Sequence, residues 1–209
     1  MDPDLTALAQ RTKGFMPETE GLALRQALLD LSVPGPVLEI GSYCGLSTLY
    51  LGDGARAGGR LLFSIDHHHG SEENQAGWAH HDPEVVDPGT GSMDTLPFFR
   101  RTIAEAGLEG TVVAVVGESA AVAGAWAPCL AMVFIDGGHA EEVAMPDYEA
   151  WAPKIVPGGV LAIHDVFPDP ADGGQAPFKV WGRALADGFI DAGVTGSLRL
   201  LRRLSLIHI

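Results

Sequence analysis

The sequence predicts a single α/β domain with a mostly parallel, doubly wound sheet and helices on both of its faces. Segments of strand and helix character alternate along the 209 residues, which is typical of repeated βαβ units. The strand segments are nearly continuous apolar runs, as expected when helices cover both faces of a sheet. No internal repeat or low-complexity linker divides residues 1–209, so we expect one domain.

The N-terminal half begins with a helical segment, residues 1–34, in which leucines recur at helical spacing over 18–31. A short apolar run then predicts a strand at 37–40, and the pattern that follows predicts a helix over 46–57. A second apolar run, 61–66, ends in an aspartate. After a connection of more than 20 residues come a predicted helix over 93–106 and a strand at 111–116.

The C-terminal half continues the alternation of helices and strands. Apolar runs predict strands at 131–136 and 160–165, and Pro157, Gly158 and Gly159 predict a turn before the second of them. An apolar–basic pattern at 197–206 predicts one or two final strands. The predicted helices of this half are 120–126, 141–155 and 178–192.

Charge and composition narrow the classes of partner. With 27 acidic and 13 basic residues the net charge is −14, and such a field repels phosphate backbones, so we expect no nucleic-acid partner. No apolar run approaches the roughly 20 residues of a membrane span, and the N-terminus lacks the pattern of a secretory signal. We therefore expect a cytoplasmic protein with no membrane partner, with Cys44 and Cys129 reduced in apolar elements. A homodimer is the common oligomeric state of such proteins.

The turn after the first predicted strand carries the strongest local signal. Gly41 directly follows the strand, where a tight turn needs a residue without Cβ. Gly45 lets the backbone approach a ligand at the start of the next helix, whose free N–H groups favour oxygen atoms. Glu39 is a carboxylate inside an apolar strand, which is costly unless it serves a ligand or a hydrogen-bond network. Tyr43 stands where the dinucleotide-binding motif would have its second glycine, so that motif is broken.

Polar residues also follow the other predicted strands. Asp66 ends the second strand, where its two oxygens suit the two hydroxyls of a ribose, and residues 117–119 follow the third. Asp136 ends the fourth strand, and His164 with Asp165 ends the fifth. In open parallel sheets ligands bind at the carboxyl ends of the strands, so we expect these side chains to meet in one site.

The pattern Glu39-x-Gly41-x-x-x-Gly45-x-Ser47-Thr48 resembles motif I of class I S-adenosylmethionine-dependent methyltransferases. The resemblance implies a Rossmann-like methyltransferase fold in which the two glycines line the methionine end of the cofactor. It also implies that Glu39 holds the amino group of the cofactor, directly or through water, and that residues 118 and 119 contact adenine. The residues expected to bind S-adenosylmethionine are Glu39, Gly41, Ser42, Tyr43, Gly45, Ser47, Asp66, His67, Glu118, Ser119 and Asp136.

The segments 134–139 and 163–165 are similar to a branch that includes small-molecule and sugar O-methyltransferases. Some relatives there hold a divalent metal with an aspartate after strand four and two acidic or amide residues after strand five. Asp136 and Asp165 match two of those positions, while His164 stands at the third and shifts the preference from magnesium toward zinc-like ions. A metal would lower the pKa of an acceptor hydroxyl. Without a metal, His139 or His164 is expected to take the proton, with Asp165 as the third catalytic candidate.

The connection over residues 67–92 is acidic and rich in histidine. Residues 61–99 contain no Lys or Arg, and a loop of this length is typically a binding loop or a solvated, mobile one. We interpret it as a substrate lid, and its lack of basic residues favours a neutral or cationic acceptor over a phosphorylated one.

The prediction from the sequence is therefore an S-adenosylmethionine-dependent methyltransferase that acts on a hydroxyl of a small-molecule acceptor. Three alternatives use the same kind of sheet. A nicotinamide oxidoreductase needs the glycine motif that Tyr43 breaks. A metal-dependent hydrolase leaves Glu39 and the glycine turn without a purpose. A non-catalytic cofactor-binding homologue would keep the same residues.

Overall fold

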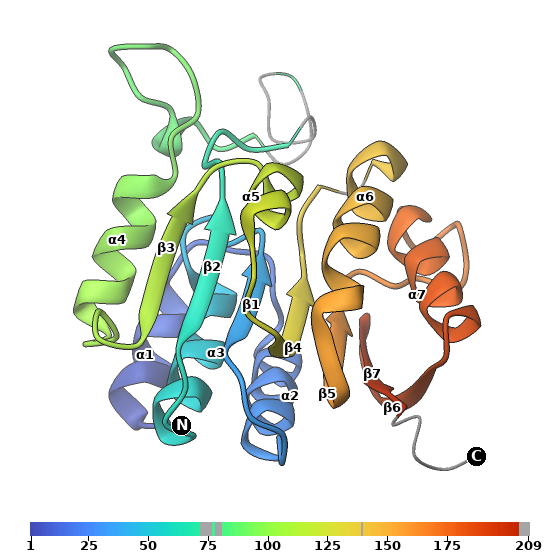
Figure 1. Cartoon of the computed structure of the whole chain (residues 1–209). Coiled ribbons are helices and arrows are strands. Elements are labelled where there is room, and N and C mark those ends of the chain that lie inside the picture. The colour runs from blue at the N-terminus through green and yellow to red at the C-terminus, as the bar shows by residue number, and fades with distance from the viewer. Residues whose placement is uncertain (72–76, 78–80, 139, 205–209) are drawn as a thin grey trace.

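A seven-stranded sheet forms the centre of the structure, a computed structural model that describes residues 1–71, 77, 81–138 and 140–204. The strand order is β3-β2-β1-β4-β5-β7-β6 (Figure 1). Strands β1 to β5 pair in parallel, whereas β7 is antiparallel to both β5 and β6. The strands are β1 Val37–Ile40, β2 Leu62–Asp66, β3 Val112–Val116, β4 Leu130–Ile135, β5 Ile155–Ile163, β6 Phe189–Thr195 and β7 Leu198–Arg203.

Helices cover both faces of this sheet, as the apolar character of its strands predicted (Figure 1). One face is packed by α1, α2, α3 and α4, and the other by α5, α6 and α7. The α/β, doubly wound, mostly parallel architecture is therefore confirmed. The helices are α1 Pro3–Arg11, α2 Glu18–Leu29, α3 Leu46–Ala57, α4 Leu96–Glu105, α5 Ser119–Ala125, α6 Glu141–Trp151 and α7 Ala176–Ala186.

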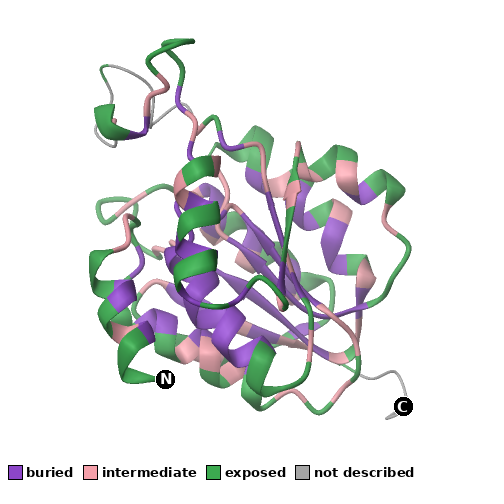
Figure 2. Ribbon diagram, turned by 90° about the vertical axis from the view of Figure 1, so that its left-hand side faces the viewer, coloured by how far each residue is buried: buried purple, intermediate pink, exposed green. Residues whose placement is uncertain are grey.

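The core consists of two layers, one on each side of the sheet. Successive residues of a strand point to opposite faces, so Met132 and Phe134 of β4 join the cluster under α1–α4. Val133 and Ile135 of the same strand join the cluster under α5–α7. Buried residues accordingly follow the strands and the inner faces of the helices, while the outer faces are exposed (Figure 2).

Three elements differ from the prediction. The helix predicted over 141–155 ends at Trp151, and a short 3₁₀ helix leads from it to β5, which begins at Ile155. The predicted turn at 157–159 lies inside β5, where the pairing jumps from Leu130 with Ile155 to Met132 with Val160, so the extra residues form a bulge rather than a break. The helix predicted over 178–192 ends at Ala186, and β6 follows it. Gly188 at φ 93° ends the helix because this left-handed conformation cannot continue a helical turn.

The N-terminal segment continues from α1 to α2 through residues that reach the acidic loop. Lys13 forms ion pairs with Asp82 and Glu84, with N···O distances of 2.6 and 2.7 Å. Within the predicted lid, residues 72–76 and 78–80 lie outside the described residues. Of the two free cysteines, Cys44 is buried as expected, but Cys129 is exposed in the turn before β4. In the part of the chain that the structure describes, no helix combines the length and apolar character needed to cross a membrane.

Candidate active site

A cavity of about 650 Å³ opens at the carboxyl ends of β1, β2, β4 and β5. The strand order reverses direction between β1 and β4, and the crevice at such a switch point is where open α/β sheets bind ligands. The cavity brings together most of the residues that the sequence predicted for the site. Those that line it are Gly41, Ser42, Tyr43, Ser47, Asp66, His67, Glu118, Ser119, Asp136, His164 and Asp165.

Three other predicted residues stand apart from that group. Glu39 and Gly45 are not among the residues lining the cavity. His139 lies outside the described residues.

The turn after β1 takes an unusual backbone path around one wall of the cavity. Gly41, Tyr43 and Gly45 have φ angles of 83°, 47° and 95°, all in the left-handed region. Tyr43 is the costly member, since a side chain with Cβ is strained there. Two hydrogen bonds hold its conformation. The Tyr43 N–H donates to the side-chain Oδ2 of Asp66, and the Gly45 N–H donates to the Ser42 carbonyl at 2.7 Å.

Asp66 is fixed by the backbone of the loops around it. Its Oδ2 accepts the N–H groups of Ser42 and Tyr43, each at 2.8 Å, and its Oδ1 accepts the N–H of His68 at 2.7 Å. A carboxylate oxygen accepts about two hydrogen bonds, so Oδ2 is occupied and Oδ1 retains room for one more donor. The sequence predicted that the two oxygens of Asp66 accept the two hydroxyls of a ribose. In this geometry only Oδ1 has room, so one ribose hydroxyl can bond directly to Asp66.

Glu39 is completely buried behind the cavity wall. Its carboxyl group accepts hydrogen bonds from the hydroxyls of Ser47, Thr48 and Ser64 at 2.6, 2.6 and 2.7 Å. Burial raises the pKa of Glu39 to about 7, although the three hydroxyl bonds oppose the rise. Ser47 also lines the cavity, so its hydroxyl connects the buried carboxyl group to the site.

This burial predicts a pH-dependent stability. Because the folded pKa of Glu39 lies above its ordinary value of 4.5, its contribution to stability is present in acid and is lost as the pH rises through 7. Between pH 5 and 8, the free energy of unfolding should fall by about 2–3 kcal/mol more in the wild type than in Glu39→Gln. Urea unfolding across this range measures the difference. Glu109→Gln, on an exposed position, is the matched control, and equal pH profiles for wild type and Glu39→Gln would contradict the prediction.

The loop after β3 and helix α6 form the wall predicted to face adenine. Ser119 begins α5, and its Oγ accepts the indole N–H of Trp151 at 2.7 Å. Asp147 of α6 also lines the cavity and is buried; burial raises its pKa to about 6, while a hydrogen bond with Ser119 opposes this. Sequence analysis missed Asp147, because a single acid inside an amphipathic helix usually faces solvent.

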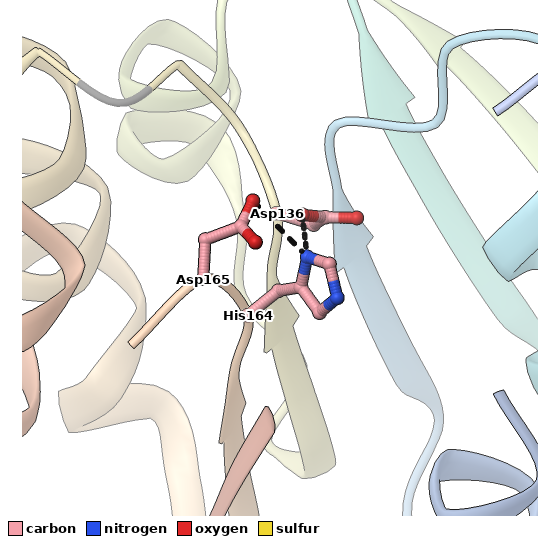
Figure 3. A group of neighbouring side chains, drawn as sticks. All are labelled: Asp136, His164 and Asp165. Carbon is pink, nitrogen blue, oxygen red and sulfur yellow. Dashed lines mark ion pairs between the residues drawn. The ribbon is translucent and has the colours of Figure 1, made fainter. Parts of the chain in front are cut away.

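The carboxylates of Asp136 and Asp165 meet the imidazole of His164 on the cavity floor (Figure 3). His164 Nδ1 lies 3.0 Å from Asp136 Oδ1 and 3.3 Å from Asp165 Oδ2. One ligand atom from each residue lies within 4.8 Å of the others, which is the spacing of a small cation site. Asp165 has a φ of 55°, and this strained backbone turns its carboxylate back toward the ring.

His164 is buried, and its two ring nitrogens have different surroundings. Nε2 lies 2.6 Å from Oε2 of Glu20, whereas Nδ1 is buried without a hydrogen bond of good geometry. Burial by itself lowers the pKa of His164, but the carboxylates of Asp136, Asp165 and Glu20 outweigh it and raise the pKa to about 12. The three carboxylates therefore favour a protonated ring, and a metal ion bound at Nδ1 would have to displace the Nδ1 proton.

Glu20 is the second residue, after Asp147, that sequence analysis missed. Acidic residues are common in the first turn of a helix, which hides its role. A signal was nonetheless available, since Glu20, Leu24 and Leu28 are spaced by four and lie on one face of α2. A carboxylate on the buried face of a helix requires a partner.

Comparison with known proteins identifies the family of this chain. Residues 38–166 match the model of a family described as a methyltransferase domain. The match covers more than half of the chain and runs from the second residue of β1 to just beyond the end of β5. The protein therefore belongs to the methyltransferase-domain family, and it is a class I S-adenosylmethionine-dependent methyltransferase.

Solved structures show the same fold over nearly the whole chain. A protein from Corynebacterium glutamicum superposes with a TM-score of 0.71 at 16% identity, covering 100% of this chain and 93% of that one. An O-methyltransferase from Bacillus cereus, in complex with S-adenosylhomocysteine, gives 0.66 at 16% identity, covering 97% and 92%. TomG from Streptomyces achromogenes, an O-methyltransferase involved in tomaymycin synthesis and bound to S-adenosylmethionine, gives 0.62 at 20% identity, covering 98% and 91%.

Proposed function

We propose that this protein transfers the methyl group of S-adenosylmethionine to a hydroxyl oxygen of a small-molecule acceptor, assisted by a divalent cation. The observation that carries the proposal is the arrangement of Asp136, His164 and Asp165 beside the glycine turn. Their ligand atoms converge on the floor of the cavity that the turn borders. The O-methyltransferases among the structural neighbours support the choice of oxygen as acceptor.

The three side chains fit a cation. The buried Nδ1 of His164, which lacks a hydrogen bond of good geometry, faces two carboxylates at 3.0 and 3.3 Å. A site with one imidazole nitrogen and carboxylate oxygens suits manganese, iron, cobalt or zinc ions better than magnesium, which prefers oxygen alone. A divalent cation bound there would lower the pKa of an acceptor hydroxyl.

The residues of the chain supply position and a proton acceptor. S-adenosylmethionine, when bound, would supply a methyl group on a sulfonium sulfur. The acceptor oxygen would bond to the methyl carbon as the carbon–sulfur bond breaks, and the electron pair of that bond would stay on sulfur. Oδ1 of Asp66 and the turn at residues 41–45 would orient the donor from one side. The partly exposed carboxylate of Asp165 would take the hydroxyl proton. Most of the rate enhancement then comes from alignment.

The charge of the cavity favours a neutral or amine-bearing acceptor. Among its described lining residues there is no Lys or Arg. An anionic acceptor would enter this field against repulsion. Phe15, 60% exposed at the cavity, has its ring 5.6 Å from that of Tyr43 and offers an apolar wall. Seven carboxylates line the cavity, from Asp66, Glu118, Asp136, Glu142, Asp147, Asp165 and Asp172.

The proposal is tested with labelled S-adenosylmethionine and a panel of phenolic and sugar hydroxyl compounds, each as neutral, amino and phosphate derivatives. We expect an O-methyl product, identified by NMR, and a kcat/KM at least about 10-fold lower for phosphate derivatives than for neutral or amino ones, because cavity charge opposes them. Treatment with a chelator should reduce the rate at least about 10-fold, and added manganese or cobalt ions should restore it.

Each part of the proposal can be overturned separately. A methyl group found on nitrogen or carbon would contradict O-methylation. A rate unchanged by the chelator, with metal content checked by elemental analysis, would contradict assistance by a cation. Preference for the phosphate derivatives would contradict the assignment of acceptor charge.

A further inference from the structure

Glu20 holds its place independently of the cavity residues it approaches. It lies in the first turn of α2 and is 4% exposed. Its Oε1 accepts the backbone N–H of Ser197, in the turn between β6 and β7, at 2.9 Å. A Cβ atom at Gly196 would lie only 2.1 Å from the same oxygen, so glycine at that position leaves room for the carboxylate. The N-terminal helix α2 therefore carries the carboxylate of Glu20, and the C-terminal hairpin of β6 and β7 holds it in place.

The carboxylate of Glu20 determines the orientation of the His164 ring about its Cβ–Cγ bond. The distance of 2.6 Å from Oε2 of Glu20 to Nε2 of His164 is that of a strong, charge-assisted hydrogen bond. Turning the ring by half a rotation would place carbon atoms against this carboxylate and lose the bond. The contact thus selects the orientation in which Nδ1 faces Asp136 and Asp165.

We propose that Glu20 is a positioning residue that binds Nε2 of His164 and thereby presents Nδ1 to a divalent cation shared with Asp136 and Asp165. Histidines that bind metals commonly donate their other ring N–H to a carboxylate, which fixes the tautomer and raises the basicity of the ligand nitrogen. The inference rests on the proposed cation site, and it assigns the N-terminal helix a part in building that site.

The test uses cobalt(II) ions as the probe and the full chain as the protein. Glu20→Gln keeps the size of the side chain but removes its charge, and Glu18→Gln removes the same charge from an exposed position in the same turn. We expect the Kd for cobalt, measured by the visible spectrum and by calorimetry, to rise about 10–100-fold in Glu20→Gln. In Glu18→Gln it should stay within about twofold of the wild type, because that side chain is exposed and does not line the cavity. Equal cobalt affinity in Glu20→Gln and wild type would overturn the inference.

A second measurement does not depend on the variant folding or on metal binding. In metal-free wild type labelled with ¹⁵N-histidine, the Nε2–H proton of His164 should give a downfield resonance protected from exchange, with nuclear Overhauser contacts to Ser197. Its absence would overturn the role of Glu20. If the wild type binds no cobalt but shows this resonance, the cation in the proposed function fails, and with it the ligand role of Nδ1, while the orientation of the ring by Glu20 is retained.

Discussion

Replacing Gly41 by alanine is expected to abolish cofactor binding and to destabilise the fold by about 3 kcal/mol. A Cβ atom at this position would lie 2.2 Å from the carbonyl oxygen of Asp136 and 2.9 Å from the Cα of Gly137. These are backbone atoms, so relieving the clash requires the backbone to move, either in the turn after β1 or in the segment after β4 that carries the proposed cation ligand Asp136. The φ of 83° adds strain of its own. Calorimetry with S-adenosylhomocysteine should show at least a 100-fold weaker Kd, and urea unfolding should show the lost stability.

A matched variant separates the clash from the strain. Gly59 has a φ of 63°, also left-handed, but a Cβ atom added there would meet no atom of the described residues within 4 Å. Gly59→Ala should therefore cost about 1 kcal/mol and leave cofactor affinity unchanged. If Gly41→Ala were no more harmful than Gly59→Ala, the close approach of β1 and β4 would not be the reason for glycine at 41.

Replacing His164 by asparagine is expected to reduce methyl transfer by a factor of about 100 or more. The substitution removes Nδ1 from the proposed cation site. It also leaves the buried carboxylate of Glu20 without its partner at 2.6 Å, and breaking such a buried pair costs about 3–5 kcal/mol. Initial rates with labelled S-adenosylmethionine, together with urea unfolding, measure both effects.

The control for this variant breaks a second ion pair, which involves α2, the helix that carries Glu20, but does not line the cavity. Arg25 Nε lies 2.6 Å from Asp53 Oδ2, between α2 and α3. Arg25→Gln should lower stability while the transfer rate per folded molecule stays unchanged. Substantial transfer by folded His164→Asn, above about a tenth of the wild-type rate, would show that the ring is not needed for the reaction.

The free energy of unfolding of His164→Asn should also depend on pH differently from that of the wild type. The ion pair with His164 holds the pKa of Glu20 below its ordinary value, although burial opposes this. That lowered pKa contributes stability above the unfolded value of 4.5, and the contribution is lost as the pH falls. Below pH 6.5 the imidazole is charged in both the folded and the unfolded state, so Glu20 alone sets the trend there. The difference in unfolding free energy between wild type and variant should therefore be larger at pH 5 than at pH 3.

Much of the fold could be predicted from the sequence because its signals are local. The apolar runs of β1, β2 and β4 and the glycines at 41 and 45 reflect short-range requirements of strand and turn. The parallel arrangement then places every strand's carboxyl end at one edge, which is why residues as distant as Asp66 and Asp165 could be assigned to one site. The boundary errors at β5 and β6 arose where a bulge and a helix-ending glycine act within otherwise continuous apolar patterns.

The sequence by itself determined the class of fold, the glycine turn and the set of polar residues at the strand ends, since each depends on residues close together in the chain. Only the tertiary structure decided which groups contact one another. It placed Glu20 against His164 across 144 positions, buried Glu39 behind three hydroxyls, and filled one oxygen of Asp66 with backbone N–H groups. These contacts follow from how helices and loops pack over the sheet, and that packing depends on long-range complementarity that no local pattern encodes.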